Sequence, residues 1–138
     1  MRQPAGNWLL MVLTAASLAA CTSSKEVPVD PNLFPADYKK EILDVLSTTL
    51  IDPTNIRGAF VTDPVLSAVN KDQRYTVCVR YSARDASRQY VGSTDRIDYF
   101  YGGHLNQFIE PAGGQCAKAP YKPFPELEKL CKSEHKCV

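Results

Sequence analysis

The clearest strand pattern of the chain is Arg74-Tyr75-Thr76-Val77-Cys78-Val79-Arg80-Tyr81-Ser82-Ala83. It alternates with a period of two, which is typical of a β-strand with one face in the core. The residues on the apolar face are Tyr75, Val77, Val79 and Tyr81, and those on the other face are Thr76, Cys78, Arg80 and Ser82. The pattern therefore predicts a central strand of a sheet that is covered on one side.

Further strands are predicted on both sides of this segment. Ile56 to Thr62 is a first strand, with an interruption at Asp63-Pro64, and after the polar turn Arg84 to Gln89 the alternation resumes from Tyr90 to Tyr101. Gly102-Gly103 is a hairpin signal, and Leu105 to Glu110 alternates again. Strands joined by short turns predict an antiparallel meander of three to four strands.

A helical period precedes the strands. From Pro35 onward apolar side chains recur at every fourth position, and Asp52-Pro53 ends the pattern. A small domain needs such an apolar stripe for its own core, so a helix that binds a partner or a membrane surface is disfavoured. We expect an α+β fold in which one amphipathic helix packs on the antiparallel three- to four-stranded meander. The stripe consists of Tyr38, Ile42, Leu46 and Leu50.

Residues 111–138 form a loop-rich C-terminal segment with one predicted helical turn pair, Pro125 to Lys132, anchored by Leu127 and Leu130. This part of the chain has little core of its own, so we expect disulfides to hold it. Four cysteines allow three pairings. We favour Cys78 with Cys116, which links this segment to the sheet, and Cys131 with Cys137, which closes a local loop.

The N-terminus has the pattern of an export signal. A positive start is followed by an apolar run from Trp8 to Ala16 and by small residues up to Ala20, and this run is too short to span a bilayer. We expect residues 1–20 to be removed, residues 21–34 to be a flexible tether, and residues 35–138 to form a single domain. Four cysteines in an exported domain are typical of disulfides.

The sequence Leu18-Ala19-Ala20-Cys21 resembles the lipobox of bacterial lipoproteins. That resemblance implies cleavage before Cys21 and acyl chains on its thiol and its amine, and several chains anchor a domain stably. Thr22 stands where an Asp would retain such a protein in the inner membrane. The resemblance therefore implies an outer-membrane lipoprotein, held by its acyl chains, with its domain in the periplasm.

Residues 40–110 resemble small uncharacterised exported α+β proteins of proteobacteria. The shared pattern is a helix, an Asp-Pro step with a following Phe, a Val-Cys strand and a Tyr-x-Gly strand. This family has no assigned activity, so the resemblance supports the fold and implies no function. The matching positions are Ile51-Asp52-Pro53-Thr54, Phe60, Val77-Cys78 and Tyr90-Val91-Gly92.

Composition excludes several functions. The 138 residues include 16 Lys and Arg against 15 Asp and Glu, and this balance disfavours nucleic acid as a partner. No nucleophile motif surrounds Ser87 or Ser93, and His104 follows a turn-forming glycine pair. We therefore expect no enzymatic activity and no cofactor beyond the lipid on Cys21.

Two groups of residues are candidate sites. Cys131, His135 and Cys137 resemble half of a metal site, although export favours a disulfide between the two cysteines. Arg80, Arg96 and Asp98 are predicted on the solvent face of neighbouring strands, where they form a candidate binding surface for peptidoglycan or an envelope protein. The leading hypothesis is a structural or protein-binding lipoprotein. The alternatives are an inhibitor of an attacking enzyme such as lysozyme, and a metal-binding or enzymatic envelope protein.

Overall fold

The computed structural model describes residues 27–131. The predicted signal peptide, the lipobox with Cys21, and the predicted ligands His135 and Cys137 lie outside these residues. The elements in chain order are α1 (Tyr38–Thr49), β1 (Asp52–Val61), β2 (Val65–Val69), β3 (Asp72–Arg84), β4 (Thr94–Tyr101), β5 (His104–Ile109), β6 (Lys122–Pro123) and α2 (Pro125–Glu128).

The six strands form one antiparallel sheet. Five of them follow the order β5-β4-β3-β1-β6, and β2 pairs with β3 outside this order. The long strand β3 is central, as predicted. Its second half pairs with β1 and its first half pairs with β2, so the two partners share one edge of β3. The α+β class and the antiparallel meander β3-β4-β5 are confirmed, whereas the expected count of three to four strands is too low.

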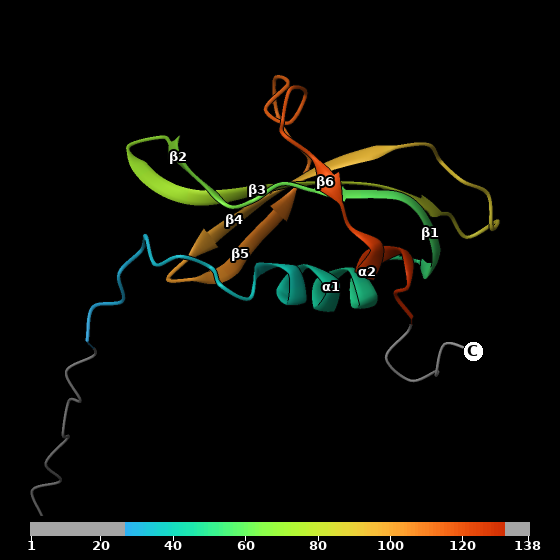
Figure 1. Cartoon of the computed structure of the whole chain (residues 1–138), viewed down its shortest axis with the longest axis horizontal. Helices are drawn as coiled ribbons and strands as arrows, with labels where there is room; N and C mark the ends of the chain where they lie inside the picture. Colours follow the sequence, from blue (N-terminus) through green and yellow to red (C-terminus); the bar gives the residue numbers. More distant parts are fainter. Residues whose placement is uncertain (1–26, 132–138) are drawn as a thin grey trace, which may run out of the picture.

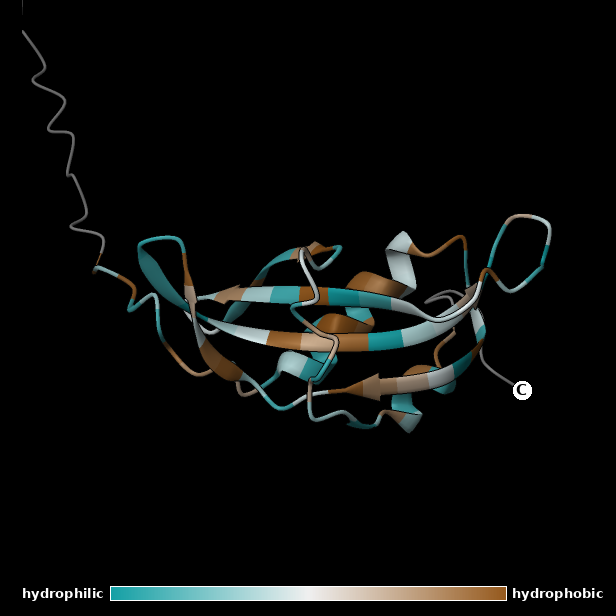
Figure 2. Ribbon diagram, turned by 90° about the horizontal axis from the view of Figure 1, so that it is seen from above, coloured by the Kyte–Doolittle hydropathy of each residue, from teal (hydrophilic) through white to brown (hydrophobic). Residues whose placement is uncertain are grey.

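The predicted core face is confirmed. Val77, Val79 and Tyr81 are at most 3% exposed and pack with Ile42 and Leu46 of α1, which are fully buried. Each of the aliphatic side chains among them, Val77, Val79, Ile42 and Leu46, contributes roughly 1.5–3 kcal/mol by leaving water. Figure 1 shows α1 lying along one side of the sheet, and Figure 2 shows hydrophobic and hydrophilic bands alternating along the strands.

The opposite face of the sheet is covered as well. The segment 110–121, which we call the strap, crosses the sheet on the side away from α1 (Figure 1). Cys116 of the strap forms a disulfide with Cys78 of β3, so the predicted link between the C-terminal segment and the sheet is confirmed. This disulfide and Ile97 form a second buried apolar cluster, against which Tyr99 and Tyr121 pack.

The end of the described chain closes the β1 edge of the sheet. Phe124 and Leu127 are fully buried, and the Ala59 amide donates to Glu128 Oε1 at 3.1 Å. The predicted helical segment Pro125 to Lys132 is thus confirmed in part: α2 ends at Glu128, and both predicted anchors, Leu127 and Leu130, pack in the core. Cys131 is itself disulfide-bonded.

The residues before α1 contact the hairpin between β4 and β5. Both Gly102 and Gly103 have positive φ, as the predicted two-residue turn requires. The Gly102 amide donates to the Pro31 carbonyl at 3.3 Å, and the ring of Phe34 meets Tyr75 edge-on with centroids 5.3 Å apart. The described part of the predicted tether therefore lies against the sheet.

Among residues 27–131, no helix is long and apolar enough to cross a membrane.

Candidate functional site

The predicted surface of Arg80, Arg96 and Asp98 does not exist as one surface. In the antiparallel pair of β3 and β4, Val77 lies opposite Asp98 and Val79 lies opposite Arg96. Directly opposed residues point to the same side of a sheet, so Arg96 and Asp98 lie on the face covered by α1. Arg80 lies on the other face, opposite Asp95.

The physical reason is that both faces of the sheet are covered. The second apolar cluster needs Ile97 beside the Cys78–Cys116 disulfide, and strand alternation then sends its neighbours Arg96 and Asp98 to the helix side. The prediction that charged side chains point to solvent was wrong for these two residues.

Asp98 is the most unusual residue on the helix side. Its side chain is fully buried, and neither carboxylate oxygen has a hydrogen-bond partner within the described residues. Burial raises the pKa of Asp98 well above its usual range, and the charge of Arg96 opposes this shift only in part. The environment therefore favours the neutral carboxylic acid.

The Arg96 side chain is 29% exposed, and its charge acts on Asp98. Its Nη1 is 3.4 Å from Glu110 Oε1, while its buried Nε has no acceptor in the described part of the chain. Burial raises the pKa of Tyr81, which keeps its phenol protonated, and the neighbouring Arg96 guanidinium opposes this shift. Tyr81, Arg96 and Asp98 form the cluster that we call the buried polar triad.

A cavity of about 280 Å³ opens next to this triad, between the end of α1 and the end of β3. Tyr81 and Arg96 line it, whereas Asp98 does not. Buried ionisable groups with shifted pKa values beside a cavity are a common feature of binding and catalytic sites. The other lining residues are Thr49, Leu50, Ile51, Ala83, Arg84, Asp85, Val91 and Thr94.

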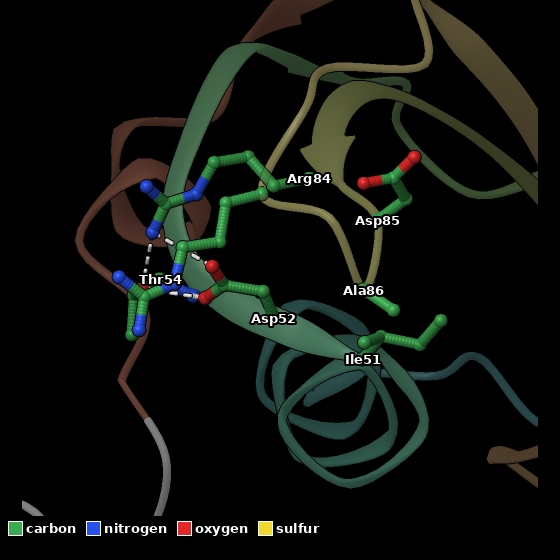
Figure 3. A pocket seen from close by; sticks show the side chains of 7 residues that line it. Ile51, Asp52, Thr54, Arg84, Asp85 and Ala86 are labelled. Atoms are coloured by element: carbon green, nitrogen blue, oxygen red, sulfur yellow. Dashed lines mark hydrogen bonds and ion pairs between the residues drawn. The ribbon is translucent and has the colours of Figure 1, made fainter.

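A second, more polar cavity of about 470 Å³ shares Ile51, Arg84 and Asp85 with the first. Figure 3 shows the carboxylate of Asp52 directed at Arg84 and Thr54, and the carboxylate of Asp85 turned away from them. Arg84 Nη2 is 2.7 Å from Asp52, and a hydrogen bond from Thr54, followed by the charge of Arg84, lowers the pKa of Asp52. Two of the four charged residues that line this cavity, Asp52 and Arg84, are thus paired with each other.

The outer face carries Arg80 and a different set of partners. Arg80 donates to both oxygens of Asp95, at 2.6 and 3.0 Å, and stacks on Tyr121 at 4.3 Å. Burial and the charge of Asp95 raise the pKa of Tyr121 to about 12. Two similar stacks lie on this face, Arg57 on Tyr90 at 4.3 Å and Arg74 on Tyr101 at 4.6 Å. We call these three pairs the Arg-Tyr face.

The remaining predicted sites are distributed as follows. His104 begins β5, is well exposed, and its Nδ1 lies 2.8 Å from Glu41 Oε1. Ser87 and Ser93 lie in the loop between β3 and β4, away from His104 in the chain. No group of three or more potential metal ligands occurs within residues 27–131, and Cys131 is oxidised in a disulfide.

The sequence analysis placed Tyr81 in the core but did not identify it as a site residue, and it did not predict the cavity. The burial of Asp98 could have been predicted from the register between β3 and β4. A pairing that places Cys78 opposite Ile97 also places Asp98 opposite Val77, on the core face. Comparison with known proteins finds no match among protein families, curated proteins or solved structures.

Proposed function

We propose that this chain is an exported lipoprotein of the bacterial envelope, anchored through Cys21, whose α+β domain binds another envelope component. The observation that carries the proposal is the buried Cys78–Cys116 disulfide, in which the two residues are 8% and 1% exposed. Structural disulfides persist in oxidising compartments such as the periplasm and are rare in the cytosol. The lipobox resemblance independently supports export and anchoring.

The Arg-Tyr face supports a binding role. Arginine and tyrosine are enriched at protein interfaces, where they supply planar, weakly hydrated contact area. The three stacks hold these side chains in defined positions before any partner arrives, which lowers the entropy lost on binding. An envelope protein or a peptidoglycan strand is the partner that we expect on this face.

The anchoring part of the proposal is tested by fractionating cells that express the natural chain or Cys21→Ser. The natural chain is expected in the outer-membrane fraction, and Cys21→Ser is expected to leave it. Ser23→Ala is the matched control because it lies close by without touching the lipobox. A natural chain recovered with the cytosol, or a Cys21→Ser protein that stays in the membrane, would refute anchoring.

The binding part is tested by photo-crosslinking in living cells. A photoreactive residue at Tyr101 or Tyr90 is expected to capture one defined partner, and the same residue at Lys40 on the solvent side of α1 is expected not to. Arg57→Glu should remove the adduct, because it reverses a charge on the Arg-Tyr face, while Lys40→Glu should leave it. Equal capture from both sides of the domain would count against the proposed surface.

A further inference from the structure

The 280 Å³ cavity beside the buried polar triad has two chemically different ends. Leu50, Ile51, Ala83 and Val91 form an apolar end, while Tyr81, Thr94 and Arg96 form a polar end. Ile51 and Val91 are 65% and 67% exposed, so they lie at the mouth of the cavity. Tyr81 is only 3% exposed, so it lies at the inner end.

Arg96 has donor capacity that the described residues do not use. Its buried Nε has no acceptor, and the carboxylate beside its Nη1 is that of Glu110, a side chain 79% exposed and 3.4 Å away. Asp98 is the nearest buried acid, but desolvation favours its neutral form. The Arg96 side chain is 29% exposed, and among the described residues its positive charge is thus paired only with the solvent-exposed carboxylate of Glu110.

The other charged groups around the cavity are occupied. Arg84 pairs with Asp52 at 2.7 Å and donates to Thr54 at 3.2 Å. Asp85 Oδ1 accepts the amides of Ser87 and Gln89 at 2.8 and 3.0 Å, which fixes this carboxylate in its own turn. An incoming anion would accordingly interact with Arg96 rather than with Arg84.

We propose that this cavity binds a small amphiphilic carboxylate. The carboxylate group of the ligand pairs with Arg96, whose planar guanidinium can donate two parallel hydrogen bonds. The same carboxylate accepts a hydrogen bond from the Tyr81 hydroxyl. The apolar body lies among Leu50, Ala83 and Val91. A volume of about 280 Å³ is at the small end for ligand pockets, so a short-chain acid fits and a complete phospholipid does not. This inference is independent of the lipid anchor and of the Arg-Tyr face.

The experiment is a calorimetric titration of the purified domain, disulfides intact, with octanoate, 1-octanol and octylammonium. Octanoate is expected to bind saturably at one site, and the other two probes are expected to bind at least about tenfold more weakly, the effect of losing roughly 1.4 kcal/mol of charge-assisted pairing. Amide shifts in the NMR spectrum should concentrate at Leu50, Val91 and Arg96. A peptide ending in a free C-terminal leucine tests whether the carboxylate comes from a peptide.

Two variants separate the proposed site from nonspecific binding. Val91→Trp fills the mouth from an exposed position and should abolish octanoate binding, whereas Ile109→Trp, at an exposed position of β5, should not. Arg96→Gln should reduce the affinity for octanoate to that for octanol. The proposal is wrong if octanoate does not bind saturably at millimolar concentration, if octanol binds equally well, or if Val91→Trp binds octanoate normally.

Discussion

Asp98 is unusual among the core residues because it is a buried carboxyl group. Buried carboxyl groups are normally hydrogen-bonded, and a missing partner for a buried polar group costs about 1–3 kcal/mol. Here both oxygens lack a partner among the described residues, and Val77 lies opposite in the sheet. The surroundings thus favour a protonated Asp98, and the folded state holds a proton that the unfolded chain releases.

This proton makes stability depend on pH. The pKa of Asp98 is raised in the folded state, so the free energy of unfolding falls as pH rises from the ordinary aspartate pKa through the raised one. Asp98→Asn removes this dependence. We expect the stability of the variant relative to the natural domain to increase as pH rises above the ordinary aspartate pKa, with a slope of at most about 1.4 kcal/mol per pH unit.

Urea unfolding at several pH values measures this slope, and Asp95→Asn is a control of opposite sign. Hydrogen bonds from Arg80 lower the pKa of Asp95, so its contribution to stability is present above the ordinary aspartate pKa and is lost as pH falls. Asp95→Asn should therefore lose stability at neutral pH. A pH-independent difference for Asp98→Asn would show that the buried carboxyl is not protonated by folding.

From the sequence, it is easier to predict which residues form a strand than to predict which face of the sheet each side chain points to. Alternation correctly assigned Val77, Val79 and Tyr81 to the core, because three apolar residues at period two leave no other choice. For β4 both faces contain large apolar residues, Ile97 and Tyr99 on one and Phe100 on the other. The register with β3 decides between them, and register is a tertiary property.

At the scale of elements, Glu41 joins α1 to the β4-β5 hairpin. Its Oε2 accepts the Leu105 amide at 2.5 Å and its Oε1 lies 2.8 Å from His104. The Glu41 side chain is 23% exposed, so water replaces these interactions only in part. Glu41 thus holds a strand that pairs, among the described residues, with β4 alone.

We expect Glu41→Ala to lower the free energy of unfolding by about 1–3 kcal/mol, because the Leu105 amide loses its charged acceptor. Hydrogen exchange at Leu105 should accelerate more than exchange at Val79 in the central strand. Lys40→Ala is the matched control: Lys40 is 75% exposed and pairs with Asp44, so its loss should cost no more than about 0.5 kcal/mol. Equal effects of the two variants would contradict the role of Glu41.

The elements that the sequence missed are short or depend on partners far along the chain. β2 follows Pro64 and has no buried residue, so it lacks the alternation that marks a half-buried strand. β6 has only two residues, and it is a strand because it pairs with Phe60 and Val61 of β1. By contrast α1 was predictable from its stripe, of which Ile42 and Leu46 are fully buried.

At the scale of the whole molecule, the strap makes a three-layer arrangement of helix, sheet and covalently linked loop. The Cys78–Cys116 disulfide closes a sequence separation of 38 residues. The chain-entropy relation for a loop of this length gives a stabilisation of about 4 kcal/mol. Since the strap also covers Ile97, we expect its release to expose the second apolar cluster.

The double variant Cys78→Ala/Cys116→Ala is therefore expected to unfold at lower urea concentration, with a loss of roughly 2–4 kcal/mol. It should also bind hydrophobic dyes more strongly than the natural domain. Full reduction of the natural domain should lower its stability by at least as much, because it also opens the disulfide of Cys131. Unchanged stability and dye binding would mean that noncovalent contacts hold the strap without the disulfide.

We propose that this chain is an exported, acylated and disulfide-bonded protein. Mass spectrometry of the protein extracted from its native membrane is the decisive measurement. We expect an N-terminus at Cys21 that carries acyl chains, with the four other cysteines oxidised. A chain that begins at Met1, lacks acyl groups and has free thiols at Cys78 and Cys116 would contradict it.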